Sequence, residues 1–260
     1  MAQTADEKAA LREDVWAELR KVGRPDSRHH WDFSSFIPDF DGSEKCSERM
    51  ANIPAYASLG DRRVFVTPDN CLDHIRTRLL LDGHPYVMTT LSMTRGFLGV
   101  EPDSVTEGEF GYAGSIDGAN NRFGRPVTVD DLRAGPPFGL MVTGCSVVSQ
   151  SGVRFGKGHG YFDVEWAVMS ELGKTDENTA IVVVCHDVQV READLQPAPH
   201  DTIADWIVTP TRTISVDHPP REPGRIRWEL LARAGRDGVP VLEELRELVG
   251  PGVSATPTDS

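Results

Sequence analysis

A glycine-rich loop is the part of this sequence best suited to hold a ligand. Residues 156–160 read Gly-Lys-Gly-His-Gly, so a glycine stands at every second position. Because glycine has no Cβ, the backbone N–H groups of such a loop can converge on one point. Arg154 and Lys157 add positive charge beside them. The combination favours a polyphosphate ligand; the alternative interpretation is a glycine-rich turn that binds nothing.

The surroundings of the loop support phosphate binding without matching either common nucleotide motif. The loop follows an apolar run that predicts a buried strand and precedes a segment that predicts a helix. A helix that begins after Gly160 directs its positive dipole end toward the loop. The sequence contains neither the closing Gly-Lys-Ser/Thr of the P-loop nor the spacing of the dinucleotide fingerprint.

Two aspartates are candidate ligands for the Mg²⁺ that accompanies a nucleotide. Asp163 falls in the first turn of the helix expected after the loop, and Asp201 lies at the mouth of a short predicted strand. Carboxylate oxygens suit this hard cation. The alternatives are an acid that complements the helix dipole at Asp163 and a turn acid at Asp201. Lys8 and Arg12, on one predicted helix, form either a solvated face or a phosphate contact.

Hydrophobic periodicity and apolar runs predict the elements that position these residues. The predicted helices are residues 5–22, 43–51, 70–81, 162–172 and 241–249. The predicted strands are residues 63–67, 86–91, 138–148, 179–185 and 206–208. We expect residues 24–60 to be ordered but irregular, and residues 101–136 to be mostly loop and turn, as a lid or an insertion.

Strands and helices that alternate, with strands apolar on both faces, predict a three-layer α/β sheet. We expect one domain over residues 1–250, in which residues 1–60 supply the N-terminal helix and the irregular segment. The polar residues 251–260 are expected to be a disordered tail.

Composition limits the class of partner and the compartment. The net charge of −13 argues against broad binding to nucleic acid or an anionic membrane. No apolar run is long enough to span a membrane, and the polar N-terminus lacks a signal core. The widely spaced cysteines fit reduced, buried thiols. We therefore expect a soluble cytoplasmic protein.

Other residues of chemical interest are given structural roles. Cys185 and His186 are adjacent on a predicted strand, so they point to opposite faces and cannot form a nucleophile–base pair. His29 and His30 have no third metal ligand in sight and are interpreted as loop or packing residues. Four tryptophans are expected in the core: Trp31, Trp166, Trp206 and Trp228.

Three motifs occur in the order that they have in 5-formyltetrahydrofolate cyclo-ligases, also called methenyltetrahydrofolate synthetases. Residues 8–12 resemble the K-x-x-L-R motif of that family. Residues 154–163 resemble its R-x-G-x-G-x-G-Y-Y-D loop, with Phe162 at the second tyrosine. Residues 199–209 resemble its closing H-D-x-x-x-D-x-x-x-T segment.

The chain is still more similar to the longer cyclo-ligase-like paralogues. Residues 156–166 resemble their G-K-G-E-G-Y-x-D-L-E-Y loop, and residues 185–190 resemble their V-H-D-x-Q-V stretch. Their I-V-T-P-T-R segment occurs unchanged at residues 207–212. The resemblance extends from about residue 8 to residue 245, which is nearly the whole chain.

The resemblance implies a Rossmann-like α/β domain akin to the sugar-phosphate isomerase and CoA-transferase group. It also implies a ligase of one-carbon metabolism that uses MgATP to phosphorylate the formyl oxygen of 5-formyltetrahydrofolate. The neighbouring folate nitrogen then attacks, phosphate leaves and methenyltetrahydrofolate forms. Such chemistry depends on positioning and charge neutralisation.

The resemblance also assigns roles to residues at matching positions. Lys157, Arg154 and Tyr161 are expected to act in catalysis, and Asp163 and Asp201 to ligate Mg²⁺. The residues expected to contact ATP are Lys8, Arg12, Arg154, Gly156, Lys157, Gly158, His159, Gly160 and Tyr161.

The chain departs from the family at positions that bear on the substrate. His159 stands where the family has glycine or an acidic residue. Residues 89–94 replace the paralogues' P-T-P-R-L-R without either arginine, and Arg95 is the nearest replacement. We find no match to the glutamate that cyclo-ligases use near the folate.

Three hypotheses of function are therefore open. The first is an ATP- and Mg²⁺-dependent cyclo-ligase that acts on a folate. The second is an ATP-dependent enzyme for a different small molecule, in thiamin-related or specialised metabolism. The third is a folate- or nucleotide-binding protein without turnover.

Overall fold

The computed structural model describes residues 4–192, 195–233 and 238–249, and the structural statements below concern these residues. The tail expected at residues 251–260 lies outside them.

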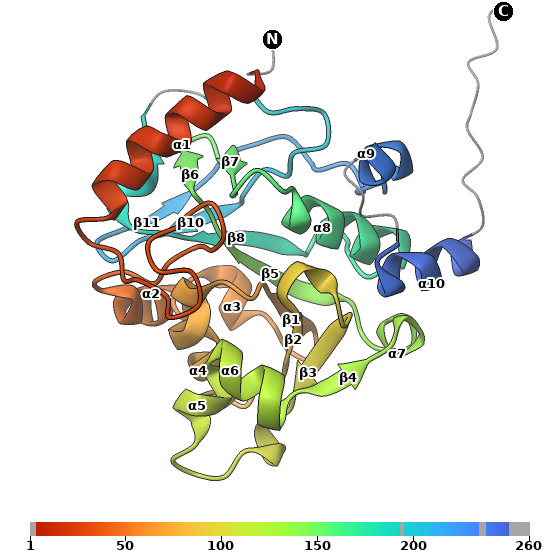
Figure 1. Cartoon of the computed structure of the whole chain (residues 1–260). Coiled ribbons are helices and arrows are strands. Elements are labelled where there is room, and N and C mark those ends of the chain that lie inside the picture. The colour runs from red at the N-terminus through yellow and green to blue at the C-terminus, as the bar shows by residue number, and fades with distance from the viewer. Residues whose placement is uncertain (1–3, 193–194, 234–237, 250–260) are drawn as a thin grey trace, which may run out of the picture.

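An eight-stranded sheet forms the centre of the molecule (Figure 1). Its strands are β1 Arg63–Val66, β2 Tyr86–Thr89, β3 Phe97–Val100, β4 Arg125–Val127, β5 Phe138–Gly144, β8 Ala180–Val184, β10 Trp206–Val208 and β11 Thr213–Ser215. They lie in the order β11–β10–β8–β5–β1–β2–β3–β4. The strands from β10 to β2 run parallel, whereas β3 pairs antiparallel with β2, β4 antiparallel with β3, and β11 antiparallel with β10.

The central strands are apolar on both faces because each face carries its own core. Along β1, Val64 and Val66 pack into one hydrophobic cluster, whereas Phe65 packs into the other. This is the period-2 alternation of a strand buried on both sides. The first core is completed by α2 Ser43–Met50, α3 Pro54–Ala57, α4 Asp73–Leu81 and α5 Phe110–Gly114. The second is completed by α7 Val129–Ala134, α8 Tyr161–Glu171, α9 Trp228–Arg233 and α10 Pro240–Val249. The predicted three-layer, Rossmann-like α/β architecture is confirmed.

A small second sheet joins the main sheet to the N-terminal helix. It is formed by β7 Arg154–Phe155, β6 Val147–Ser149 and β9 Val190–Arg191, in that order. The helix α1, Ala5–Leu19, lies across β6 and β7 in Figure 1 and shares a cluster with them through Val15, Val147 and Phe155. The apolar run 138–148 is therefore two strands in two sheets, because the chain leaves the main sheet at Gly144.

The prediction for residues 101–136 was wrong. Instead of loop, they form a 3-10 helix at Pro102–Ser104, α5, α6 at Ile116–Gly118, a π-helical turn at Ala119–Phe123, β4 and α7. Each of these elements is too short to show a hydrophobic period. For the same reason β3 and α9 were not predicted. The first helix also ends at Leu19, three residues before its expected end at Val22.

No helix in the described ranges has the length and apolar character needed to cross a membrane.

Candidate functional site

A cavity of about 920 Å³ opens at the carboxyl ends of the central parallel strands. Thr67, Thr89 and Thr143, at or just after the ends of β1, β2 and β5, line it. The chain continues from β1 to β2 in one direction across the sheet and from β5 to β8 in the other. Ligands of α/β sheets bind where the strand order reverses in this way. The volume lies at the upper end of the range for small-molecule sites.

The glycine loop forms one wall of this cavity, between β7 and the start of α8. Gly158 and Gly160 have φ of 106° and 66°, values that side chains disfavour, so the loop depends on glycine there. Gly160 is the N-cap of α8 and no side chain caps this end. The positive end of the α8 dipole therefore faces the loop without a side-chain cap, in the position where the sequence predicts a phosphate.

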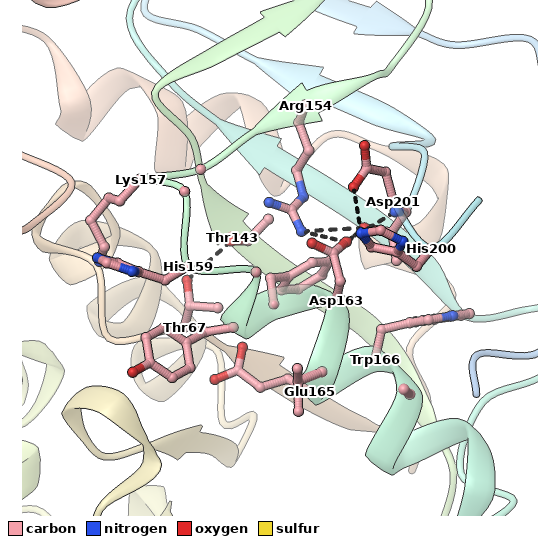
Figure 2. A pocket seen from close by; sticks show the side chains of 18 of the residues that line it. Thr67, Thr143, Arg154, Lys157, His159, Asp163, Glu165, Trp166, His200 and Asp201 are labelled. Atoms are coloured by element: carbon pink, nitrogen blue, oxygen red, sulfur yellow. Dashed lines mark hydrogen bonds and ion pairs between the residues drawn. The ribbon is translucent and has the colours of Figure 1, made fainter. Parts of the chain in front are cut away.

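Arg154 and Asp163 form a partly buried ion pair beneath the loop (Figure 2). The guanidinium Nη2 lies 3.0 Å from Asp163 Oδ1, and the guanidinium also stacks over the Phe162 ring at 4.4 Å from its centroid. The same Oδ1 accepts hydrogen bonds from the backbone N–H and the hydroxyl of Thr202, each at 2.9 Å. Arg154 is thus held at the edge of the cavity before any ligand binds.

Helix α1 brings two further cations to the loop. Arg12 Nε donates to the carbonyl oxygen of Gly156 at 2.7 Å, which ties the helix to the loop. Lys8 Nζ lies 3.2 Å from Asp201 Oδ2 and 4.3 Å from the centroid of the Phe155 ring. Both side chains line the cavity. Lys8 and Arg12 are thus close to the loop in space, although more than 140 residues separate them from it in the sequence.

Lys157 extends from the glycine loop at a place apart from Arg154 and Asp163 (Figure 2). Its Nζ lies 3.9 Å from Asp69 Oδ1, a loose ion pair. Asp69 follows β1 and is held by the backbone N–H of Gly144 at 3.0 Å and by the hydroxyl of Thr67. Asp69 is therefore the acid nearest the Lys157 ammonium and holds it only loosely.

His159 and Tyr161, the other side chains predicted for the site, line the cavity together with His200. His159 is exposed and its ring lies 6.0 Å from that of Tyr161, which is half-buried. His200 Nε2 lies 3.8 Å from Asp201 Oδ1. All nine residues expected to contact ATP, with Asp163 and Asp201, line this one cavity.

Asp163 and Asp201 are the candidate carboxylates for a magnesium ion, and in this structure they pair with Arg154 and Lys8. The backbone N–H that follows Asp201, that of Thr202, donates to Asp163, so the two acids are neighbours. In the described part of the chain no group of three or more His, Cys, Asp or Glu side chains is placed to hold a metal by itself. Mg²⁺ is commonly bound through one or two carboxylates together with substrate phosphates.

Several polar residues of the cavity were not predicted from the sequence, among them Asp69, Thr143 and Glu165. The signal for Asp69 was its position just after a buried strand, where α/β sheets present ligand groups. The signal for Glu165 was a charge inside an otherwise apolar helix segment. Glu165 is only 2% exposed, and burial raises its pKa to about 8, although a hydrogen bond from Thr89 acts in the opposite direction.

In the segment that departs from the family, residues 89–94, residues 89–93 line the cavity beyond β2. Ser92 and Met93 line it with φ of 56° and 58°, a conformation uncommon for residues other than glycine. Backbone strain of this kind gathers at ligand-contacting segments. The altered segment is thus placed to contact whatever occupies the cavity next to the loop.

The structural roles given to other residues are partly confirmed. Cys185 is fully buried, and a hydrogen bond with Cys145 and burial raise its pKa well above the ordinary value, so its thiol is no nucleophile. His29 stacks on Phe36 with centroids 5.7 Å apart, which is the expected packing role. Of the four tryptophans predicted for the core, Trp166 is buried, Trp206 and Trp228 are partly buried against the two cores, and the prediction was wrong for Trp31, which is 41% exposed in an irregular surface segment.

The fold and this cavity define an α/β protein with a small-molecule site at the carboxyl edge of its sheet. A model of the 5-formyltetrahydrofolate cyclo-ligase family matches residues 4–210. The chain belongs to that family.

Curated relatives carry the name methenyltetrahydrofolate synthase domain-containing protein. The human protein is 27% identical over 245 residues, which are 92% of this chain and 61% of the relative. The mouse protein is 29% identical over 248 residues, 92% of this chain and 63% of the relative. The zebrafish protein is 28% identical over 215 residues, 82% of this chain and 55% of the relative. The chain thus spans about three fifths of the length of these relatives.

Proposed function

We propose that this protein is an ATP- and Mg²⁺-dependent cyclo-ligase that activates the formyl oxygen of a folate for ring closure to a methenyl product. The observation that supports it most is the convergence of four cations, Lys8, Arg12, Arg154 and Lys157, with an uncapped helix N-terminus on one cavity. A triphosphate carries the complementary charge.

The residues act mainly by holding and neutralising charge. The N–H groups of the loop and of the first turn of α8 cradle phosphate oxygens. Arg154 and Lys157 stabilise the negative charge that develops as the phosphoryl group moves from the nucleotide to the formyl oxygen. When Mg²⁺ is bound, Asp163 and Asp201 hold it, and it supplies further neutralisation of the phosphates.

Ring closure requires that the acceptor lie next to the transferred phosphoryl group. The cavity extends from the loop to the carboxyl ends of β1 and β2, so a second molecule fits beside the phosphates. Phe162, Trp166 and Met93 give that part apolar walls, which exclude water from an activated formyl group.

The activity is tested by mixing the protein with 5-formyltetrahydrofolate, ATP and Mg²⁺ and recording methenyl absorbance. We expect product to form, and Lys157→Ala to lower kcat/KM by about 100-fold because it removes a charge next to the transferred group. Lys21→Ala is the matched control, since Lys21 pairs with Glu18 at the surface and is 67% exposed. A folded wild-type protein that forms no methenyl product would show that this reaction is wrong.

A second candidate is an ATP-dependent enzyme for another small molecule. The altered segment 89–94 favours it, because this segment lines the acceptor end of the cavity. Phosphate release from ATP with candidate acceptors distinguishes the two functions. Turnover only with non-folate acceptors supports the second candidate, and ATP binding without any turnover supports a binding protein.

A further inference from the structure

Arg76 is a fully buried charge that the proposed reaction does not use directly. It lies on α4, and its side chain does not reach the cavity. A buried arginine is rare, because taking a guanidinium out of water costs free energy unless a counter-charge and hydrogen-bond acceptors replace the water. The partners of Arg76 therefore indicate what the charge does there.

The guanidinium of Arg76 donates mainly to backbone carbonyls. Nη1 donates to the carbonyl oxygen of Thr67 at 2.8 Å, and Nη2 donates to that of Asp69 at 3.2 Å. Nε donates to the carbonyl oxygen of Gly114, the last residue of α5, at 2.7 Å. Asp73, one turn earlier on α4, supplies a negative charge to Nη2. The planar fork of an arginine suits such a spread of acceptors, whereas the single ammonium of a lysine does not.

Two of these carbonyls belong to a turn that lines the cavity. Thr67, Pro68 and Asp69 follow β1 directly, and all three line it. Arg76 holds the carbonyls of the first and the last of them. The turn therefore cannot shift without breaking a buried hydrogen bond, which leaves a buried polar group unsatisfied.

The two oxygens of the Asp69 carboxylate connect this turn to different parts of the site. Oδ2 accepts from the Thr67 hydroxyl and, at 3.0 Å, from the backbone N–H of Gly144 on β5. Oδ1 faces the Lys157 ammonium across 3.9 Å. At that separation the carboxylate orients the ammonium by charge and leaves it free to turn toward a phosphate. A displaced turn would move this charge relative to Lys157.

We propose that Arg76 is a positioning residue for phosphoryl transfer, which acts through the turn at residues 67–69 and the Asp69 carboxylate on Lys157. Because Arg76 does not line the cavity, it acts without contact to either substrate. The inference rests on the proposed function, in which Lys157 lies next to the transferred group. A displacement of about 1 Å near the reacting atoms can lower a rate by up to about 100-fold, so this hold on the turn bears on kcat.

A double-mutant cycle in kcat tests the connection, with 5-formyltetrahydrofolate, ATP and Mg²⁺ as substrates. Arg76→Lys keeps the charge but loses the fork. We expect it to lower kcat about tenfold and to change the KM for ATP by less than about threefold. Asp69→Asn should also lower kcat. If Arg76 acts through Asp69, the double variant should lie within about twofold of the slower single variant, and the two losses should not multiply.

Two substitutions on the same helix separate positioning from stability. Arg78→Lys changes an arginine that pairs with Asp82 and is 40% exposed, so kcat should stay at the wild-type value. Leu79→Ala removes a fully buried apolar side chain, so it should lower the urea concentration at which the protein unfolds. Its effect on kcat should nevertheless stay within about twofold and should multiply with that of Asp69→Asn.

The amide resonance of Gly144 provides a readout without turnover. Its N–H donates to Asp69 Oδ2, so Asp69→Asn should shift it in a nitrogen–proton correlation spectrum. Arg76→Lys should shift it in the same direction, and Leu79→Ala should leave it near the wild-type position. Asp73→Asn removes one partner of the guanidinium at a partly exposed side chain, and it should cause a smaller shift even if Arg76→Lys does not fold.

These measurements separate the inference from the function on which it rests. A folded wild type without turnover contradicts the proposed function, and the Gly144 resonance then still decides whether Arg76 holds Asp69 in place. Losses in kcat that multiply in the cycle would overturn the assignment. So would a Gly144 resonance that stays at the wild-type position in both Arg76→Lys and Asp73→Asn.

Discussion

Arg154 is held from several directions before any ligand binds. Asp163 and the Thr202 hydroxyl accept from its Nη2, and the Phe162 ring lies beneath it. A side chain fixed in this way loses little freedom when it contacts a phosphate, so binding costs less entropy. Lys157 is positioned similarly but more loosely, at 3.9 Å from Asp69.

The glycines of the loop are not equivalent, and their backbone conformations say which is required. Gly158→Ala places a Cβ at φ of 106°, whereas a Cβ at Gly156 would meet only Arg154 Nη1 at an ordinary 3.8 Å. We expect Gly158→Ala to lower the free energy of unfolding by about 1–3 kcal/mol and to weaken ATP binding. Gly156→Ala should change stability by less than about 0.5 kcal/mol. Urea denaturation measures both, and equal losses would contradict the loop conformation.

At the scale of elements, α1 packs beside the glycine loop and places two cations, Lys8 and Arg12, next to it. Its capping box at Thr4 and Glu7 starts the helix, and its buried residues Val15, Trp16 and Leu19 attach it to two small clusters. Lys8 and Arg12 then project from the same helix toward Asp201 and Gly156. Packing and ligand contact are thus combined in one element.

The attachment of α1 predicts a large effect from one core substitution. Leu19 is fully buried, so Leu19→Ala should lower the free energy of unfolding by about 2–5 kcal/mol. Leu81→Ala is the matched control, because Leu81 is 60% exposed and its loss should cost less than about 0.5 kcal/mol. Both values come from urea denaturation curves. If the two substitutions cost the same, α1 does not pack as described.

At the scale of the whole molecule, two cores on opposite faces of one sheet hold the strand ends in place. That arrangement brings the ends of β1, β2 and β5 and the start of α8 to one cavity. It also places Glu165 where water does not reach, so that the stability of the fold becomes coupled to the protonation of this residue.

The pKa of Glu165, raised by burial to about 8 from an ordinary 4.5, sets the direction of this coupling. Between these two values the folded chain keeps a proton that the unfolded chain has lost, so stability falls as pH rises from 4.5 to 8 and then levels off. The full penalty is on the order of 5 kcal/mol. Glu165→Gln should remove it, so its stability relative to wild type should increase from pH 5 to pH 8. Urea denaturation at both pH values measures this difference, and parallel curves would argue against a neutral Glu165.

The sequence by itself determined the chemistry of the loop and the class of fold. Residues 154–163 combine glycines, cations and an acid within ten positions, and these are local properties of the chain. The strands with apolar residues at every position could only be buried on both faces, which predicts the layered sheet. Short elements such as α5 and β4 could not be predicted, because a segment of a few residues shows no hydrophobic periodicity.

Tertiary structure decided which residues far apart in the sequence meet. Asp69 reaches Lys157, Thr89 reaches Glu165, and Lys8 reaches Asp201 only because the strand ends and α1 converge on one edge of the sheet. The protonation of Glu165 was also decided there, since a carboxyl group ionises according to its burial and its neighbours and not according to its place in the sequence.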